Sequence, residues 1–260
     1  MSTTNVPSLF ANAQQEGELS TQTMNVINKI PNMGAKIKAN LGINMQDVPA
    51  SDVVLVSLLI DDSGSIQSAN NEQLVRDGYN LVLESLLAAK QKNNILITVQ
   101  YLNGTVLFPY VLLQDAVRMD ATNYRANGGT PLYDKTVELL TTVLAKTRES
   151  YEDGTPARSI TLIITDGEDV HSRHNTAADV AVLTKEMLSK EDHIIATMGV
   201  DNGSTDFRKI FADMGIQDKW VLTPGNNPKE IRQAFQMFSQ SAVRASQTAA
   251  NIAGLGGFGA

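Results

Sequence analysis

The chain has 260 residues, a formal net charge of −7 at pH 7 and no cysteine. The lack of cysteine excludes disulfides, thiolate metal sites and cysteine nucleophiles. The acidic balance, without any Lys/Arg-rich run, argues against nucleic acids and anionic membranes as partners. The longest apolar run, 53–60, is far below the roughly 20 residues of a membrane helix. The N-terminus lacks the basic and apolar segments of a signal peptide, so a cytoplasmic protein is expected.

The first 50 residues are expected to form an arm with short helices outside the main domain. Residues 1–17 are polar and without periodicity, which predicts a mobile arm. A helical pattern of apolar residues starts at Ser20, is interrupted at Pro31 and ends at Gly42. This pattern indicates either two short helices or one kinked helix.

The main domain, expected over residues 51–245, alternates apolar strands with amphipathic helices. Asn103-Gly104 predicts a hairpin turn between two of the strands. The expected strands are 53–60, 94–102, 105–113, 159–165, 193–200 and 219–223. The expected helices are 71–90, 131–146, 177–188, 205–214 and a long final helix from Pro228.

Strands that are apolar on both faces and alternate with helices indicate an α/β fold. We expect a mostly parallel central sheet with one antiparallel edge strand and helices on both faces. Ligands of such sheets bind at the carboxyl ends of the strands. Asp61 and Asp166 each lie one residue past an expected strand, so both fall at that edge.

Five oxygen-bearing side chains are expected to meet there. In an extended turn after the first strand, alternate residues can point the same way. The candidate metal ligands are Asp61, Ser63, Ser65, Thr130 and Asp166. Two carboxylates and three hydroxyls suit a hard divalent cation of the magnesium type. A turn that merely caps the next helix is the alternative for the first three.

These five positions resemble the metal-ion-dependent adhesion site of von Willebrand factor type A domains. That family carries Asp-x-Ser-x-Ser, a later Thr and a later Asp-Gly, and this chain matches throughout. The resemblance covers roughly residues 51–245 and implies a Rossmann-like sheet that carries Mg²⁺, with Mn²⁺ or Ca²⁺ also open. It further implies that Ser63, Ser65 and Thr130 touch the ion directly, while the two aspartates often act through water. A partner protein's Asp or Glu would then complete the coordination.

Two finer expectations follow from the resemblance. The absent signal peptide and the run Phe235-Gln-Met-Phe-Ser-Gln-Ser resemble intracellular bacterial proteins of tellurite-resistance and related stress systems. Four polar residues after Asp166 are candidates to ring the metal and contact the partner, with a plain solvated loop as the alternative. These residues are Glu168, Asp169, His171 and Arg173. Zinc binding by His171 and His174 is disfavoured, because only acidic neighbours accompany them.

The expected function is a non-enzymatic binding module, and two other classes of function are alternatives to it. The first is a Mg-dependent phosphoaspartyl protein with Asp166 as acceptor, but the strand 193–200 ends without the lysine expected of a receiver-type fold. The second is a structural assembly component. Its basis is a heptad seam along the final helix, formed by Ile231, Phe235, Phe238, Ala242, Ala245, Ala249 and Ile252. The second half of the seam, past Ala245, could pack on the N-terminal helices or on a second chain. Residues 246–260 are expected to be a helix end and a loose Gly-rich tail.

Overall fold

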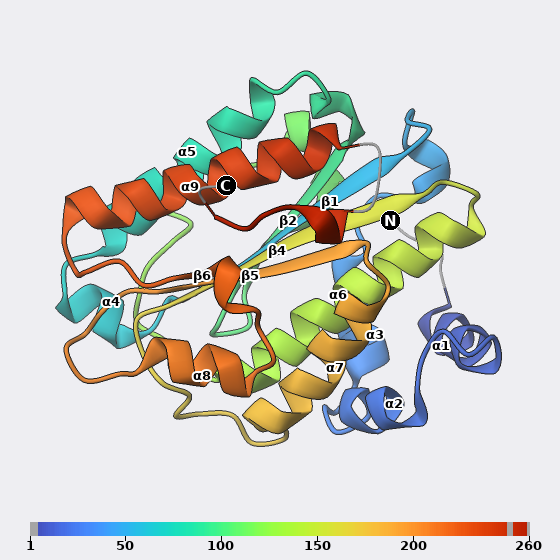
Figure 1. The fold of residues 1–260 in the computed structure, drawn as a ribbon, viewed down its shortest axis with the longest axis horizontal. Coiled ribbons are helices and arrows are strands. Elements are labelled where there is room, and N and C mark those ends of the chain that lie inside the picture. The colour runs from blue at the N-terminus through green and yellow to red at the C-terminus, as the bar shows by residue number, and fades with distance from the viewer. Residues whose placement is uncertain (1–4, 249–251, 259–260) are drawn as a thin grey trace.

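The central feature is a single mixed sheet (Figure 1). The computed structural model describes residues 5–248 and 252–258. Within these residues six strands form the sheet, in the order β3-β2-β1-β4-β5-β6. All neighbouring pairs are parallel except β2 and β3, which are antiparallel. The strands are β1 (Val53–Ile60), β2 (Ile95–Tyr101), β3 (Val106–Leu112), β4 (Ala157–Thr165), β5 (His193–Gly199) and β6 (Val221–Leu222).

Helices cover both faces of this sheet (Figure 1). Helices α5 and α9 pack together on one face, and α6, α7 and α8 lie on the other. Helices α1 to α3 form an outer layer against α6 and α7. The helices are α1 (Val6–Gln15), α2 (Thr21–Ile27), α3 (Met33–Asn40), α4 (Gly64–Ser68), α5 (Glu72–Leu87), α6 (Leu132–Glu152), α7 (Ala177–Ser189), α8 (Phe207–Asp213) and α9 (Pro228–Gln247).

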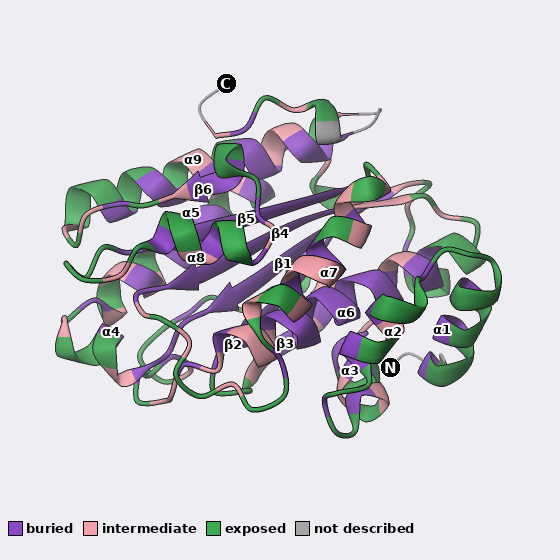
Figure 2. Cartoon of the chain, turned by 60° about the horizontal axis from the view of Figure 1, so that its bottom comes forward, coloured by how far each residue is buried: buried purple, intermediate pink, exposed green. Residues whose placement is uncertain are grey.

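The first strand shows why the chain folds this way. All eight residues of β1 are buried, because the strand has helices on both sides (Figure 2). Val54, Val56 and Leu58 join the core beneath α5 and α9, whereas Leu59 joins the core beneath α6 and α7. Alternate side chains of a strand point to opposite faces, so a strand between two helical layers must be apolar throughout. The predicted α/β arrangement, a mostly parallel central sheet with one antiparallel edge strand and helices on both faces, is confirmed.

The predicted mobile arm at the N-terminus is wrong for the described residues. Residues 6–15 form α1, whose N-cap Asn5 accepts a hydrogen bond from the Ser8 backbone. The helix buries one face in the core shared with α6 and α7, through Val6, Leu9, Phe10 and Ala13. The helical spacing of these four apolar residues covers only eight positions, and the polar residues between them make it hard to recognise in the sequence. The helical pattern that follows is confirmed as two short helices, α2 and α3, rather than one kinked helix.

The C-terminal residues are also more ordered than predicted. Helix α9 ends at Gln247, and residues 252–254 form a 3-10 turn in which Ile252 is fully buried. Phe258 then packs edge-on against Trp220, with ring centroids 5.3 Å apart. Its backbone N–H donates to the carbonyl of Lys219. The tail is therefore packed on the domain through residues 252–258, whereas Ala249 of the predicted seam lies outside the described residues.

Other differences are small. Helix α6 runs two turns beyond its predicted end, and a short helix, α4, follows β1 where only a turn was expected. The seam residues Ile231, Phe235 and Phe238 are buried in the chain's own core. Among the described helices, none combines the length and the apolar character that crossing a membrane requires.

Candidate metal centre

The predicted ligands Asp61 and Asp166 lie side by side at the carboxyl edge of the sheet. They follow β1 and β4, which are neighbours with Ile60 opposite Ile164. The chain turns directly from β1 into α4, which starts at Gly64 and carries Ser65 in its first turn. The turn that carries Ser63 and Ser65 therefore lies next to the carboxyl end of β4.

Hydrogen bonds join four of the five predicted residues into one network. The hydroxyls of Ser63 and Ser65 are 2.8 Å apart. The Ser65 hydroxyl donates to Asp166 Oδ1 at 2.6 Å. Asp61 Oδ1 accepts from the Ser63 backbone N–H at 2.8 Å. The alternation that the sequence suggested thus places Asp61, Ser63 and Ser65 together, with Asp166 meeting them from β4.

Asp61 is held in place from two further directions. Its Oδ2 accepts from the hydroxyl of Thr165 at 2.7 Å, and that hydroxyl in turn accepts from the Gly167 N–H at 3.1 Å. The hydroxyl of the buried Tyr124 donates to the Asp61 carbonyl. Sequence reasoning missed both residues. Thr165 could have been found, since it directly precedes Asp166, but Tyr124 has no signature in its local sequence.

Thr130 reaches this edge through a backbone connection two residues earlier. Gly128 N–H donates to the Asp62 carbonyl at 2.8 Å, and Gly64 N–H donates to the Gly128 carbonyl at 3.1 Å. Ser63 and Gly128 form an isolated parallel bridge as a result. Thr130 is 7% exposed and lies in the loop thereby paired with the Ser63 turn. The structure therefore brings the loops of all five residues together and links four of them by side-chain contacts.

The carboxylates of this edge lie in an unfavourable electrostatic environment. Burial raises the pKa of Asp61, against hydrogen bonds from Ser63 and Thr165 that lower it. Burial also raises the pKa of Asp166 to about 6, and the charge of Asp61 adds to this effect. Burial likewise raises the pKa of Asp62 to about 6. Gathered, desolvated carboxylates are stabilised when a positive charge is placed among them.

The residues present fit a hard divalent cation. Across the described residues, no Lys or Arg forms an ion pair with Asp61, Asp62 or Asp166. The buried Asp62 Oδ2 has no hydrogen-bond partner there either. Carboxylate and hydroxyl oxygens suit magnesium or manganese better than zinc. In the described part of the chain, no group of three His, Cys, Asp or Glu side chains is arranged so that these residues alone could hold a metal ion.

The segment after Asp166 clamps the Thr130 loop. His171 Nδ1 accepts from the Thr130 backbone N–H at 2.9 Å. The Thr130 carbonyl accepts from the N–H groups of Val170 and His171. A Cβ at Gly129 would lie 2.8 Å from His171 Nδ1, so only glycine lets the ring approach this closely. His171 is therefore placed to position Thr130, a role that the sequence did not reveal.

Replacing His171 with alanine is expected to free the Thr130 amide, because its hydrogen-bond acceptor is lost. A net hydrogen bond of about 1 kcal/mol corresponds to roughly fivefold faster amide exchange at Thr130. His171→Asn should restore protection, since Asn Oδ1 occupies the place of Nδ1. Hydrogen exchange followed by NMR on the metal-free chain measures this, with His174→Ala as the matched control. Equal Thr130 protection in His171→Ala and the native chain would contradict the clamp.

The other predicted partner contacts differ in exposure. Glu168, His171 and Arg173 are exposed at the rim of the cluster. Asp169 is half-buried, and its Oδ1 accepts from the Tyr133 N–H at the start of α6 and from the Ser172 hydroxyl. Asp169 thus has a structural task in the loop, and the assignment of all four as partner contacts stays a prediction.

Comparison with known proteins shows that this chain is similar to solved structures in its fold. No family model and no curated protein matches the sequence. The pilus adhesin SpaC from Lactobacillus rhamnosus GG, in its open conformation, matches with a TM-score of 0.53 and 15% identity over 75% of this chain. The match spans 30% of the adhesin. A von Willebrand factor type A protein from Catenulispora acidiphila has a TM-score of 0.47 and 17% identity, over 75% of this chain and 43% of that one. Manganese-loaded TRAP protein from Plasmodium vivax has a TM-score of 0.43 and 17% identity, over 71% of this chain and 74% of that one.

At these identities the likeness to the adhesin concerns the fold alone. The structure defines this chain as a three-layer α/β domain. An oxygen-rich cluster, without a basic partner among the described residues, lies at the carboxyl edge of its sheet.

Proposed function

We propose that this chain is a metal-dependent protein-interaction module of the von Willebrand factor type A class. Asp61, Ser63, Ser65, Thr130 and Asp166 would hold one divalent cation, Mg²⁺ first and Mn²⁺ or Ca²⁺ as alternatives. The chain would act by binding a protein partner through that partner's Asp or Glu, and not by catalysis. Its affiliation with bacterial stress systems, its cytoplasmic location and self-association through α9 stay predictions from the sequence.

One observation supports the proposal above the others. Ser63, Ser65 and Asp166 come from segments 101 residues apart, yet their side-chain oxygens are in hydrogen-bond contact. A turn that only capped the next helix would require neither Asp166 nor the backbone pairing of Gly128, two residues before Thr130, with this turn. The turn also gives no side-chain cap to α4.

The chemistry of the residues explains why a partner would be needed. A bound divalent cation supplies a positive centre that attracts an external carboxylate. If the neutral hydroxyls of Ser63, Ser65 and Thr130 touch the ion and the two carboxylates act through water, as the resemblance implies, the ion keeps a strong attraction for an external carboxylate. Direct contact with several carboxylates would remove that attraction. Thr165 and the Ser63 backbone orient Asp61, and His171 orients Thr130, so the donor atoms are arranged before binding.

Titration with Mn²⁺ tests the metal site directly. The native chain should bind one Mn²⁺, followed by electron paramagnetic resonance or calorimetry. Ser65→Ala and Asp166→Asn should each weaken binding by about 10- to 100-fold, because each removes or neutralises a donor. Ser85→Ala on α5, whose hydroxyl donates to the Leu81 carbonyl far from the cluster, is the matched control. A native chain that binds no Mn²⁺ at millimolar concentration would refute the metal site.

A pair of short peptides tests the partner carboxylate. A peptide with one central Glu should bind the Mg²⁺-loaded chain, and the same peptide with Gln should bind at least tenfold more weakly. Chelation by EDTA should abolish the difference. Equal binding of both peptides by the Mg²⁺-loaded chain would leave a metal site without the proposed recognition, and the function would have to be revised.

A further inference from the structure

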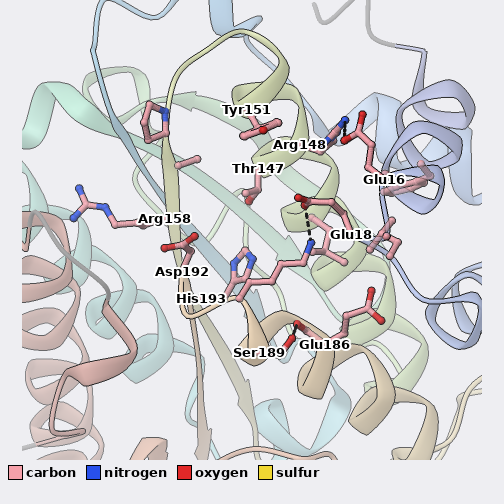
Figure 3. Close-up of a pocket in the computed structure, with 18 of the residues that line it drawn as sticks. Glu16, Glu18, Thr147, Arg148, Tyr151, Arg158, Glu186, Ser189, Asp192 and His193 are labelled. Atoms are coloured by element: carbon pink, nitrogen blue, oxygen red, sulfur yellow. Dashed lines mark hydrogen bonds and ion pairs between the residues drawn. The ribbon is translucent and has the colours of Figure 1, made fainter.

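A second region, at the amino ends of strands β4 and β5, has the properties of a small-molecule site. A cavity of about 1150 Å³ lies between the turn after α1, the last turns of α6 and the segments that begin β4 and β5 (Figure 3). It is open on one side. Because β4 runs from this cavity to Asp166, the two sites are separated by the length of a strand.

The ion pairs at this cavity share an unusual asymmetry. In each of them the basic side chain is the buried member and the acidic one is exposed. The side chains of Arg148, Arg158 and Lys190 are 9%, 13% and 27% exposed, against 52%, 41% and 46% for their partners Glu16, Asp52 and Glu18. The cations thus belong to the wall, whereas exposed acids of this kind contribute little stability and can be displaced.

The same wall contains buried polar atoms that lack partners. Four lining residues carry such an atom among the described residues, namely Thr147 Oγ1, Arg148 Nη1, Arg158 Nη1 and His193 Nε2. Buried polar atoms are normally satisfied, so a cluster of exceptions around one cavity points to a ligand or ordered water. Because these four atoms have almost no accessible surface, a ligand would reach them only after the exposed acids are displaced. In Figure 3, Thr147 and His193 lie between Arg148 on one side and Arg158 on the other.

His193 extends this set of donors. Its residue is 1% exposed, and its Nδ1 is 2.7 Å from the Ser159 hydroxyl. Burial lowers the pKa of His193 to about 3, so the ring is neutral at physiological pH. When the Ser159 hydroxyl donates to Nδ1, the remaining proton sits on Nε2, which then becomes a donor. Three of the four unpartnered groups are then N–H donors, and the fourth is a hydroxyl.

We propose that this cavity binds a small organic anion, with a carboxylate or phosphate head on an apolar body. Guanidinium groups bind such heads with paired, charge-assisted hydrogen bonds. The remaining wall suits the apolar body, since Phe10, Leu19, Leu144 and Pro156 line it.

The lining contains five acids, Glu16, Glu18, Asp52, Glu186 and Asp192, against the three cations Arg148, Arg158 and Lys190, so an anion must displace acids in order to bind. Asp52 pairs with Arg158, and Asp192 is exposed within reach of the charge of Arg158. Glu186 accepts hydrogen bonds from the hydroxyls of Ser20 and Thr23, so it is occupied within the wall. Glu16 and Glu18 belong to the exposed turn after α1, and each occupies a cation that a ligand would need. An arriving anion would compete with these two side chains. Ligand binding would therefore exchange contacts of the N-terminal segment for contacts with the ligand.

Four probes of equal length test the class of ligand. The full chain, labelled with ¹⁵N, is titrated with hexanoate, hexyl phosphate, hexylamine and 1-hexanol. We expect the amides of Thr147, Lys190 and His193 to shift with hexanoate or hexyl phosphate, at least tenfold more tightly than with the other two. The better of the two anions identifies the head group. Equal or tighter binding of hexylamine or hexanol, or no shift with any probe, would overturn the proposal.

Charge variants give a test with opposite signs. Lys190→Gln should weaken binding of the preferred anion by about tenfold, since one charge-assisted contact is lost. Glu18→Gln should strengthen it several-fold, because it removes the competitor of Lys190. Lys185→Gln, on the exposed side of α7 and outside the lining, is the matched control. Unchanged affinity in Lys190→Gln, or weaker binding in Glu18→Gln, would show that the ligand is not held as an anion.

Discussion

Alanine at Gly42 is expected to destabilise the fold by about 3–5 kcal/mol, from left-handed backbone strain together with overpacking. Gly42 has a φ of +65°, and a Cβ there would lie 1.9 Å from the Tyr110 carbonyl oxygen. That oxygen already accepts a hydrogen bond from the N–H of Ile43, so the backbones cannot separate without losing it. The substitution would detach the N-terminal segment from β3.

Gly17→Ala provides the matched control for this effect. Gly17 has a φ of +76°, but nothing lies within 4 Å of its potential Cβ. Gly17→Ala should therefore lower the free energy of unfolding only by the backbone strain of a non-glycine residue, about 1–2 kcal/mol. Urea denaturation of both variants measures the difference. Equal losses in the two would show that the contact with Tyr110 is not the cause.

Acidification is expected to remove a stabilising contribution of the neutral His193 ring. Burial lowers the pKa of this imidazole from 6.5 to about 3 in the folded chain. The unfolded chain therefore takes up the proton first as the pH falls. The contribution to stability is complete above pH 6.5 and is lost progressively down to about pH 3, by up to about 1.4 kcal/mol per pH unit.

A variant that cannot titrate isolates this contribution. His193→Asn keeps a polar group near Ser159 but removes the proton uptake. His193→Asn should be less stable than the native chain at pH 7, and this difference in stability should shrink as the pH falls from 6 to 4. Asp62 and Asp166 titrate in the same range with the opposite sign, but they are common to both chains. A native pH slope in His193→Asn would refute the assignment.

The strands and the carboxyl-edge site could be predicted because their signals are local. The run 53–60 is apolar at every position, and the alternation of Asp61, Ser63 and Ser65 is written in five adjacent residues. Sheet topology then brings Asp166 to the same edge, since β1 and β4 are parallel neighbours. Pattern and topology are enough to predict this part of the site.

The parts that were missed depend on distant partners. His171 and Thr130 are 41 residues apart and meet through two hydrogen bonds, from the Thr130 N–H to His171 Nδ1 and from the His171 N–H to the Thr130 carbonyl. The tail is fastened by Phe258 on Trp220 and by Arg244, which donates to the Gly257 carbonyl. These contacts arise from tertiary packing, so no window of the sequence contains them. The α1 helix is a different case, because its cap at Asn5 and its apolar spacing were local signals that a polar composition outweighed.

Helix α6 links the loop of Thr130 to the cavity at the other end of the domain. It starts two residues after Thr130, and its final turns supply Thr147, Arg148 and Tyr151 to the opposite end of the domain. With 21 residues it is a rod about 30 Å long. Buried residues occur along this helix from Leu132 to Ser150, so it is held along most of its length and fixes the separation between the Thr130 loop and the cavity.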